Sequence, residues 1–325
     1  MRHARFAGDR SDVRQRHRPC PGDGPAGGLG KGDAAYVGLQ AAVAIIAEGL
    51  PRERIHLGHR LVGLNDSGDI VEAMFDNGAT ATADVLIGAD GIHSTVRTLL
   101  FGAEDPKFAG CVAYRGLVPA ERIADLGLAR GSQSWLGPGA HLVHYFVSGG
   151  RLLNFVGWTE HDTWSREDWT DRATVERALA AFEGWHPQIR GIISAADTCF
   201  IWALFDRDPL PRWSAGRVTL LGDACHPMYP FMAQGAAQAI EDGAALAALL
   251  AGGGDPVAAL RRYEDVRLPR VTRLQEMSRA NKHRYHMQDG SEQEARDAAM
   301  AASRERAPET LRWLFGFDAA VVDAG

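Results

Sequence analysis

Residues 217–242, RVTLLGDACHPMYPFMAQGAAQAIED, combine a short apolar run, a turn and the start of an alanine-rich segment. The run RVTLL predicts a buried strand that delivers Gly222 and Asp223 to the edge of a sheet. A helix is expected to begin near Gln234 and Gly235, with its unpaired backbone N–H groups and positive dipole end facing the preceding loop. An anion, or a ring that becomes anionic, would be stabilised at this place.

A second segment, residues 84–97 (DVLIGADGIHSTVR), repeats the strand-to-helix plan. Its apolar strand is expected to run into Gly88, Asp90 and Gly91, and Ser94 stands at the N-cap position of the next helix. A carboxylate at the carboxyl end of a strand lies where open α/β sheets bind ligands. A tight turn capped by Asp90 explains the same residues equally well.

Length and composition limit the class of protein. The chain has 325 residues, 46% hydrophobic and 23% charged, which predicts a globular protein of about two domains. Its net charge of −6 argues against nucleic acid or an anionic membrane as partner. We expect a cytoplasmic protein without a metal site, because the sequence contains no signal sequence, no long apolar run and no CxxC pair.

The pattern of apolar residues divides the chain into an α/β domain and a sheet domain. Residues 1–34 show no periodicity and are expected to be irregular and outside the fold. Residues 35–104 and 209–285 are assigned to the α/β domain, and residues 105–208 are assigned to the inserted sheet domain because β-rich stretches dominate them. Residues 286–325 are expected to form a helical tail.

Within the α/β domain, a helix is expected over residues 36–50. Three strands joined by tight turns are expected in residues 56–64, 70–75 and 79–91. The last of them carries few polar residues at 85–88, which predicts a strand that is buried on both faces.

These segments resemble the single-component, FAD-dependent aromatic hydroxylases, the family of salicylate hydroxylase and 6-hydroxynicotinate 3-monooxygenase. The resemblance covers roughly residues 36–290 and depends on GADGIHSTVR, LFDRDPLPRW and GDACHPMYPFMAQGAAQAIEDG. It implies an α/β fold with an FAD-binding, Rossmann-like domain that is incomplete at its N-terminus. It further implies an inserted β-sheet substrate domain and a helical C-terminus.

The resemblance implies FAD as cofactor and NADH or NADPH as co-substrate. Asp223 is implied to bond the ribityl chain of FAD, residues 230–235 to pack along the flavin ring, and Asp90 and Arg97 to lie near the cofactor. The complete set of implied cofactor-binding residues is Gly222, Asp223, Asp90, Gly91, Arg97, Pro230, Gln234, Gly235 and Ala236.

The implied reaction is hydroxylation of an aromatic (hydroxy)carboxylate by O2. In the family, NAD(P)H reduces FAD, a flavin hydroperoxide forms, and its distal oxygen passes to an electron-rich ring. His226 is the candidate for drawing a proton from the substrate phenol, because imidazole titrates near neutrality; a purely structural bond to the turn is the alternative. The sequence leaves the substrate, the choice of nicotinamide donor, and a monomer or homodimer open.

The N-terminus departs from the family. Gly22, Gly24 and Gly27 match GxGxxG formally, but Pro25 lies inside the turn and the preceding RQRHRPCP cannot form an apolar strand. Tyr36 stands where the family has an arginine that reaches FAD. We therefore expect the chain to lack the usual dinucleotide-binding start and to bind FAD weakly or not at all. The alternative function is accordingly a catalytically impaired remnant or a binding protein of the same fold.

Three further features receive ordinary interpretations. Arg115 could pair with a substrate carboxylate, although an exposed salt bridge is the simpler expectation. Cys225 and His226 are not expected to form a nucleophile pair, since neighbours on a turn rarely face each other. A solvated helical face is expected for the basic cluster Arg261, Arg262, Arg267, Arg270 and Arg273.

Overall fold

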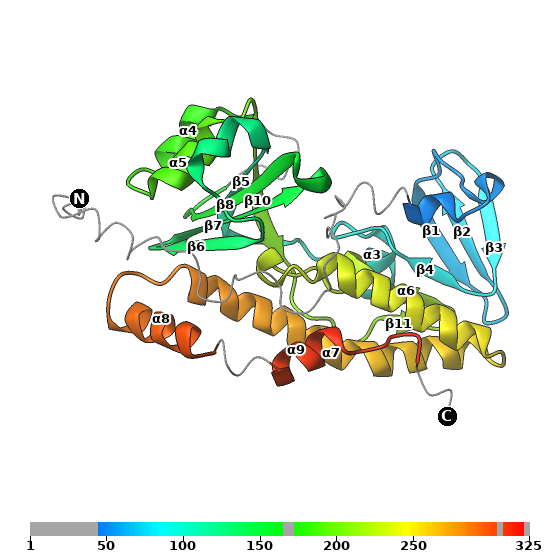
Figure 1. Ribbon diagram of the computed structural model, residues 1–325. Coiled ribbons are helices and arrows are strands. Elements are labelled where there is room, and N and C mark those ends of the chain that lie inside the picture. The colour runs from blue at the N-terminus through cyan, green and yellow to red at the C-terminus, as the bar shows by residue number, and fades with distance from the viewer. Residues whose placement is uncertain (1–44, 165–171, 304–307, 322–325) are drawn as a thin grey trace. The chain divides into compact units, whose positions relative to one another are not determined.

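The computed structural model describes residues 45–164, 172–303 and 308–321 (Figure 1). The chain divides into two compact units, which are described separately. The sheet unit contains residues 45–50, Phe108–Leu204 and His283–Pro308, and the α/β unit contains Pro51–Lys107, Phe205–Lys282 and Glu309–Gly325. Residues 45–50 therefore fall outside the α/β domain to which the sequence assigns them.

These limits fall within four residues of the domain boundaries assigned from sequence at 105, 208 and 285. The expected helical tail is divided, because His283–Pro308 belongs to the sheet unit and Glu309–Gly325 to the α/β unit. Residues 1–34, and with them the rejected GxGxxG match, lie outside the described residues, as does most of the helix expected over 36–50.

The α/β unit is organised around a three-stranded sheet of order β11-β12-β4. Strand β12 (Val218–Leu220) pairs in parallel with β4 (Leu86–Gly88) and antiparallel with β11 (Ser214–Ala215). Helices α3 (Thr95–Phe101), α6 (Gly235–Ala251) and α7 (Pro256–Tyr285) contribute to this unit (Figure 1). Its buried apolar core includes Val96, Trp213, Leu220, Leu246 and Tyr263.

A separate antiparallel ribbon precedes β4 and corrects one prediction. It consists of β1 (Leu61–Asp66), β2 (Val71–Phe75) and β3 (Thr80–Ala83). The single strand expected over residues 79–91 is therefore two strands, since β3 pairs with β2 and β4 pairs with β12.

The break between β3 and β4 coincides with an arginine contact. Arg217 donates from Nη1 to the backbone oxygen of Asp84 at 2.9 Å and from Nε to that of Gly68 at 2.6 Å. Its backbone N–H also bonds Asp66 Oδ2 at 2.8 Å.

The expectation that residues 85–88 are buried on both faces was wrong, because Ile87 is 40% exposed.

The sheet unit is a six-stranded sheet of order β6-β7-β8-β5-β10-β9. Helices α4 (Val175–Ala181) and α5 (Pro187–Ser194) cover one of its faces, as Figure 1 shows. The strands are β5 (Lys107–Pro119), β6 (Gln133–Gly137), β7 (Ala140–Val147), β8 (Leu152–Glu160), β9 (Arg172–Ala173) and β10 (Cys199–Asp206).

The remaining elements are short helices. Two α-helices follow α7, namely α8 (Ser291–Ser303) and α9 (Pro308–Phe315). Within the described ranges, no helix combines the length and the apolar character that crossing a bilayer requires. The 3-10 helices are η1 (Arg52–Arg54), η2 (Ala120–Leu126), η3 (Ser148–Gly150), η4 (Gly222–Ala224) and η5 (Pro230–Met232).

Gly88 provides a test of how tightly β4 packs. A Cβ atom there would lie 2.6 Å from Val96 Cβ and 2.9 Å from Leu220 Cδ2, so both neighbours would have to move. We expect Gly88→Ala to lower the free energy of unfolding by about 1–3 kcal/mol in chemical denaturation. The control Gly243→Ala, inside α6 with no atom within 4 Å of its added Cβ, should raise it by up to about 1 kcal/mol. Equal effects of the two substitutions would contradict this packing.

Candidate functional site

The two segments singled out in the sequence lie side by side at one edge of the α/β sheet. Leu220 is paired with Gly88 across the parallel ladder, and the N–H of Leu221 donates to the Gly88 oxygen at 2.9 Å. Beyond this pair the chain turns at Gly222, whose φ of 64° favours glycine. A Cβ at Gly222 would also lie 3.2 Å from the Cβ of Ala239 in α6. Asp90 and Asp223 thus follow neighbouring, parallel strand ends.

The carboxylate of Asp90 is occupied by the start of α3. It accepts hydrogen bonds from Ser94 Oγ at 2.5 Å, Thr95 N at 2.7 Å and Val96 N at 3.1 Å. Gly91 makes the turn with a φ of 78°. Of the two interpretations of this segment, the structure contains the capped turn, and the N-cap at Ser94 predicted from sequence is confirmed. A direct role of Asp90 and Gly91 toward a cofactor stays a prediction.

Asp223 differs from Asp90 because its carboxylate is uncommitted. It is exposed and makes no hydrogen bond to the described residues. The protein packed around its base removes part of its hydration and raises the pKa of the carboxyl above 3.8, while nearby His226 acts in the opposite direction. Asp223 therefore retains hydrogen-bonding capacity for a ligand.

Arg97 is a buried cation on the first turn of α3 with one free donor. It is 3% exposed, and its Nη2 donates to Glu104 Oε2 at 2.6 Å. Its Nη1 is buried without a hydrogen-bond partner among the described residues. Arg207, from the LFDRDPLPRW motif, connects the segments on either side of α3 by donating to the backbone oxygens of Ile92 and Glu104. A buried, unpaired guanidinium N–H calls for an acceptor that a ligand could bring.

The N-terminus of α6 is open as the sequence predicts. No side chain caps it, and its first turn contains no acidic residue. Gln234 is buried and accepts from Gln238 Nε2 at 3.1 Å. A Cβ on Gly235 would touch only Met228, at 3.9 Å, and Ala236 is exposed. The backbone N–H groups in the first turn of this 17-residue helix are thus left for an external acceptor.

These groups suit the FAD that the resemblance implies. The phosphates and ring carbonyls of FAD are acceptors for the N–H groups of α6 and for Arg97 Nη1. Its ribityl hydroxyls are donors for the Asp223 carboxylate. Pro230, which begins η5, is exposed beside this helix start. The donors and acceptors that the chain presents at this edge fit the cofactor.

A single buried carboxylate, Asp242 in α6, holds the site together. Its Oδ2 accepts from the N–H of Gly222 at 3.1 Å and from His226 Nε2 at 2.5 Å. Its Oδ1 accepts from Arg267 Nε at 2.8 Å. Burial alone would raise the pKa of Asp242, but the bonds and charges of His226 and Arg267 outweigh it and hold the pKa below 3.8. The carboxylate thus joins the end of β12, the following loop and α7.

Two of the five arginines in the basic cluster on α7 correct the solvated face expected from sequence, whereas Arg261, Arg262 and Arg273 are exposed as expected. Arg267 is 0% and Arg270 8% exposed. Arg267 donates to Glu241 Oε2 at 2.6 Å and to Gln238 Oε1 at 2.7 Å, and Arg270 Nε donates to Glu241 Oε2 at 3.0 Å. Sequence reasoning missed this network. The available signal was the pair of adjacent carboxylates, Glu241 and Asp242, in an otherwise alanine-rich helix.

His226 is fully buried inside the α/β unit. Besides its bond to Asp242, its ring centroid lies 5.2 Å from that of Trp213, and its backbone N–H donates to the Gly222 oxygen. Its Nδ1 has no partner among the described residues. These contacts favour the structural alternative for His226, and its catalytic role stays a prediction.

Cys225, His226 and Asp242 offer ligand atoms within 4.8 Å of one another, a spacing that a metal ion could bridge. Two observations favour a hydrogen-bonded cluster instead. Asp242 is already bonded to Arg267, and burial raises the pKa of the Cys225 thiol, which disfavours the thiolate that metals bind. The same raised pKa makes Cys225 a poor nucleophile.

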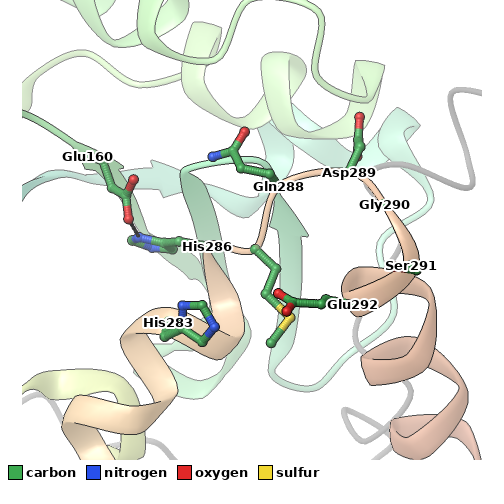
Figure 2. Close-up of a pocket in the computed structure, with 9 residues that line it drawn as sticks. Glu160, His283, His286, Gln288, Asp289, Gly290, Ser291 and Glu292 are labelled. Carbon is green, nitrogen blue, oxygen red and sulfur yellow. Dashed lines mark hydrogen bonds and ion pairs between the residues drawn. The ribbon is translucent and has the colours of Figure 1, made fainter.

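A pocket of about 410 Å³ lies elsewhere, in the sheet unit (Figure 2). Glu160, His283, His286 and residues 287–292 line it. His286 connects the pocket wall to the buried sheet, since it bonds Glu160 Oε1 at 3.3 Å and His141 Nδ1 at 2.7 Å. None of the site residues expected from sequence lines this pocket.

The chain is similar to known flavin-dependent hydroxylases over most of its length. The family model described as FAD binding domain matches residues 45–278. A 3-amino-4-hydroxybenzoate 2-monooxygenase from Streptomyces platensis is 44% identical over 78% of the chain, and a 6-hydroxynicotinate 3-monooxygenase from Bordetella bronchiseptica is 39% identical over 73%. The chain spans only 64% and 63% of the lengths of these two curated relatives.

The likeness extends to three-dimensional structure. A salicylate hydroxylase solved as a substrate complex matches with a TM-score of 0.77 and 30% identity. The match covers 86% of this chain and 72% of that one. The resemblance read from the sequence motifs is therefore confirmed, together with the α/β fold and the FAD-binding domain.

Removing the charge of Asp242 tests the network. We expect Asp242→Asn to lower the free energy of unfolding by about 3–5 kcal/mol, because it removes the anion bonded to buried His226 and leaves buried Arg267 with Glu241 as its one remaining carboxylate among the described residues. Urea unfolding at neutral pH measures the loss. The control Asp208→Asn removes an exposed carboxylate that pairs with Lys107 at 2.6 Å and more loosely with Arg279 at 3.6 Å, and it should cost less than about 1 kcal/mol. Losses of equal size would show that the Asp242 bonds are not the main support.

The same network predicts a dependence on pH. The pKa of Asp242 is lower in the folded protein than its ordinary 3.8, so its ionised form stabilises the fold above pH 3.8. This contribution is lost as the pH falls through the lower, folded pKa. The difference in unfolding free energy between wild type and Asp242→Asn should therefore be level above about pH 5 and shrink in more acidic solution. A difference that grows on acidification would contradict the assignment.

Proposed function

The chain belongs to the family of FAD-binding aromatic hydroxylases, and from this we propose that it is a monooxygenase acting on an aromatic (hydroxy)carboxylate. In the proposed reaction one atom of O2 enters the ring and the other leaves as water. NAD(P)H supplies the two electrons and, with one proton from solvent, balances the equation. The observation that carries the proposal is the pair of parallel strand ends beside the uncapped start of α6.

When bound, FAD supplies the redox chemistry and the activation of O2. We assign Asp223 to accept hydrogen bonds from the ribityl hydroxyls, and the N–H groups of Gly235 and Ala236 to stabilise negative charge on the ring. Arg97 Nη1 is assigned to an acceptor oxygen of the cofactor. Asp90 contributes by fixing the helix turn that carries Arg97.

The remaining expected residues shape the binding edge. Gly222 and Gly91 turn the chain without side chains, so the backbone can approach a ligand closely. The segment that leads into α6 begins at Pro230 and ends at Gln234. We assign them to packing along the flavin ring.

His226 is proposed to act on the reaction as a positioning residue. Its Nε2 bond to Asp242 and the bond from Gly222 N to the same carboxylate fix the turn that presents Asp223. The ring is fully buried, which supports this role over direct contact with a substrate phenol.

The names of the relatives support the substrate class. The two curated relatives are named for a benzoate and a nicotinate, each with an amino or hydroxy substituent. Such substituents donate electrons to the ring, and the ring must be electron-rich to accept oxygen. We therefore propose an aromatic carboxylate that carries a hydroxy or amino group.

The function is tested with the purified full chain and added FAD. The atypical N-terminus predicts weak FAD binding, whereas the unused donors at the start of α6 and on Arg97 support the proposal that the chain binds FAD when it is supplied in excess. Absorbance should show this binding, and 3-amino-4-hydroxybenzoate, 6-hydroxynicotinate or salicylate should accelerate NADH or NADPH oxidation. Isotopically labelled O2 should place one labelled oxygen in the product. A folded protein that binds no FAD would favour the impaired remnant or binding protein and overturn the proposal.

Asp223 is the residue whose removal should matter most for the cofactor. We expect Asp223→Asn to weaken FAD binding about 10- to 100-fold, the loss of a charged hydrogen bond worth about 1.5–3 kcal/mol. Fluorescence titration of FAD measures it. Asp69→Asn, another exposed carboxylate of the same unit, is the matched control and should leave the affinity unchanged. Unchanged affinity in both variants would remove Asp223 from the site.

A further inference from the structure

The six-stranded sheet has two different faces, and Arg115 lies on the one opposite α4. Across the ladder Arg115 is paired with Val156, and Val156 is paired with Val143, so the three share a face. Tyr114 and its partner Gly157 lie on the other face.

Helix α4 and the residues after it cover the face of Tyr114. The ring centroid of Phe182 lies 6.4 Å from that of Tyr114, and a Cβ on Gly157 would lie 2.4 Å from Phe182 Cζ. The face of Arg115 is more open, since Arg115 is exposed and Leu117, two residues further along β5, is 51% exposed. An exposed cation on this face is therefore accessible to a small molecule.

The guanidinium of Arg115 is held over two aromatic rings. Its Cζ lies 5.0 Å from the ring centroid of Trp202 and 5.6 Å from that of Phe200. Trp202 is 7% exposed, so the ring beneath the cation is fixed within the sheet. Cation–π contact orients a guanidinium without using its N–H groups.

Within the part of the chain that the structure describes, no ion pair offsets the charge of Arg115. Among the described residues its side chain makes neither a salt bridge nor a hydrogen bond, so the exposed salt bridge expected from sequence is absent there. An oriented guanidinium with unused donors is suited to a planar anion, which it binds through two parallel N–H···O bonds.

We propose that Arg115 binds the carboxylate of the aromatic substrate. This inference rests on the proposed function, in which the substrate is a ring that carries a carboxylate. Val143 and Val156, half-buried on the same face, offer apolar surface beside the cation for the ring itself. The carboxylate is ionised at neutral pH, so the arginine selects it over uncharged phenols.

The test compares two ligands that differ only in this group. Binding of 3-amino-4-hydroxybenzoate and of 2-aminophenol to the FAD-supplemented full chain is measured by calorimetry, and KM and kcat are measured in parallel. We expect Arg115→Gln to raise Kd and KM for the carboxylate about 10- to 100-fold and to leave kcat and the affinity for 2-aminophenol nearly unchanged. The carboxylate affinity of Arg115→Lys should lie between those of wild type and Arg115→Gln. Lysine keeps the positive charge but loses the two parallel N–H donors of the guanidinium.

The control is Arg151→Gln, which replaces an exposed arginine of the same unit immediately before β8; this variant should bind both ligands as wild type does. Unchanged carboxylate affinity in Arg115→Gln would overturn the inference, and so would equal losses for both ligands or no carboxylate binding by wild type. The proposed function fails separately: carboxylate binding that depends on Arg115 without any hydroxylation would support this inference and overturn the function.

Discussion

The candidate site depends on one buried carboxylate. Asp242 accepts hydrogen bonds from the end of β12, from His226 in the following loop and from Arg267 in α7. A charge removed from water is tolerated only when its partners replace the lost hydration, and here two cationic or polar side chains and one backbone N–H do so. This group fixes the loop after β12, helix α6 and helix α7 to one another.

As a consequence for function, some charged residues of the site stabilise the fold and others remain available to bind a ligand. Asp90 and Asp242 are committed to structure, because their oxygens are bonded to the protein. Asp223, the first turn of α6 and Arg97 Nη1 retain unused hydrogen-bonding capacity at the same edge of the sheet. The rigid part of the unit thus presents the groups that a polar, partly anionic cofactor requires.

Local patterns in the sequence predicted the local elements well. The N-cap at Ser94, the strand RVTLL and the long helix after Gln234 are all present, because each depends on neighbours within a few residues. The parallel pairing of β4 with β12 brings together the ends of the two strands that these motifs predict.

Predictions that depended on distant partners were less successful. The pattern of α7 alone predicts a solvated face for Arg267, since nothing in that helix reveals that Asp242 and Glu241 lie opposite it. The pattern of residues 79–91 predicts one strand, because its two halves find different partners only in the folded chain. Hydrogen–deuterium exchange with and without FAD tests the central claim most directly: protection should increase in peptides covering residues 88–97 and 220–238. Protection confined to residues 283–292, or no change on adding FAD, would contradict the account.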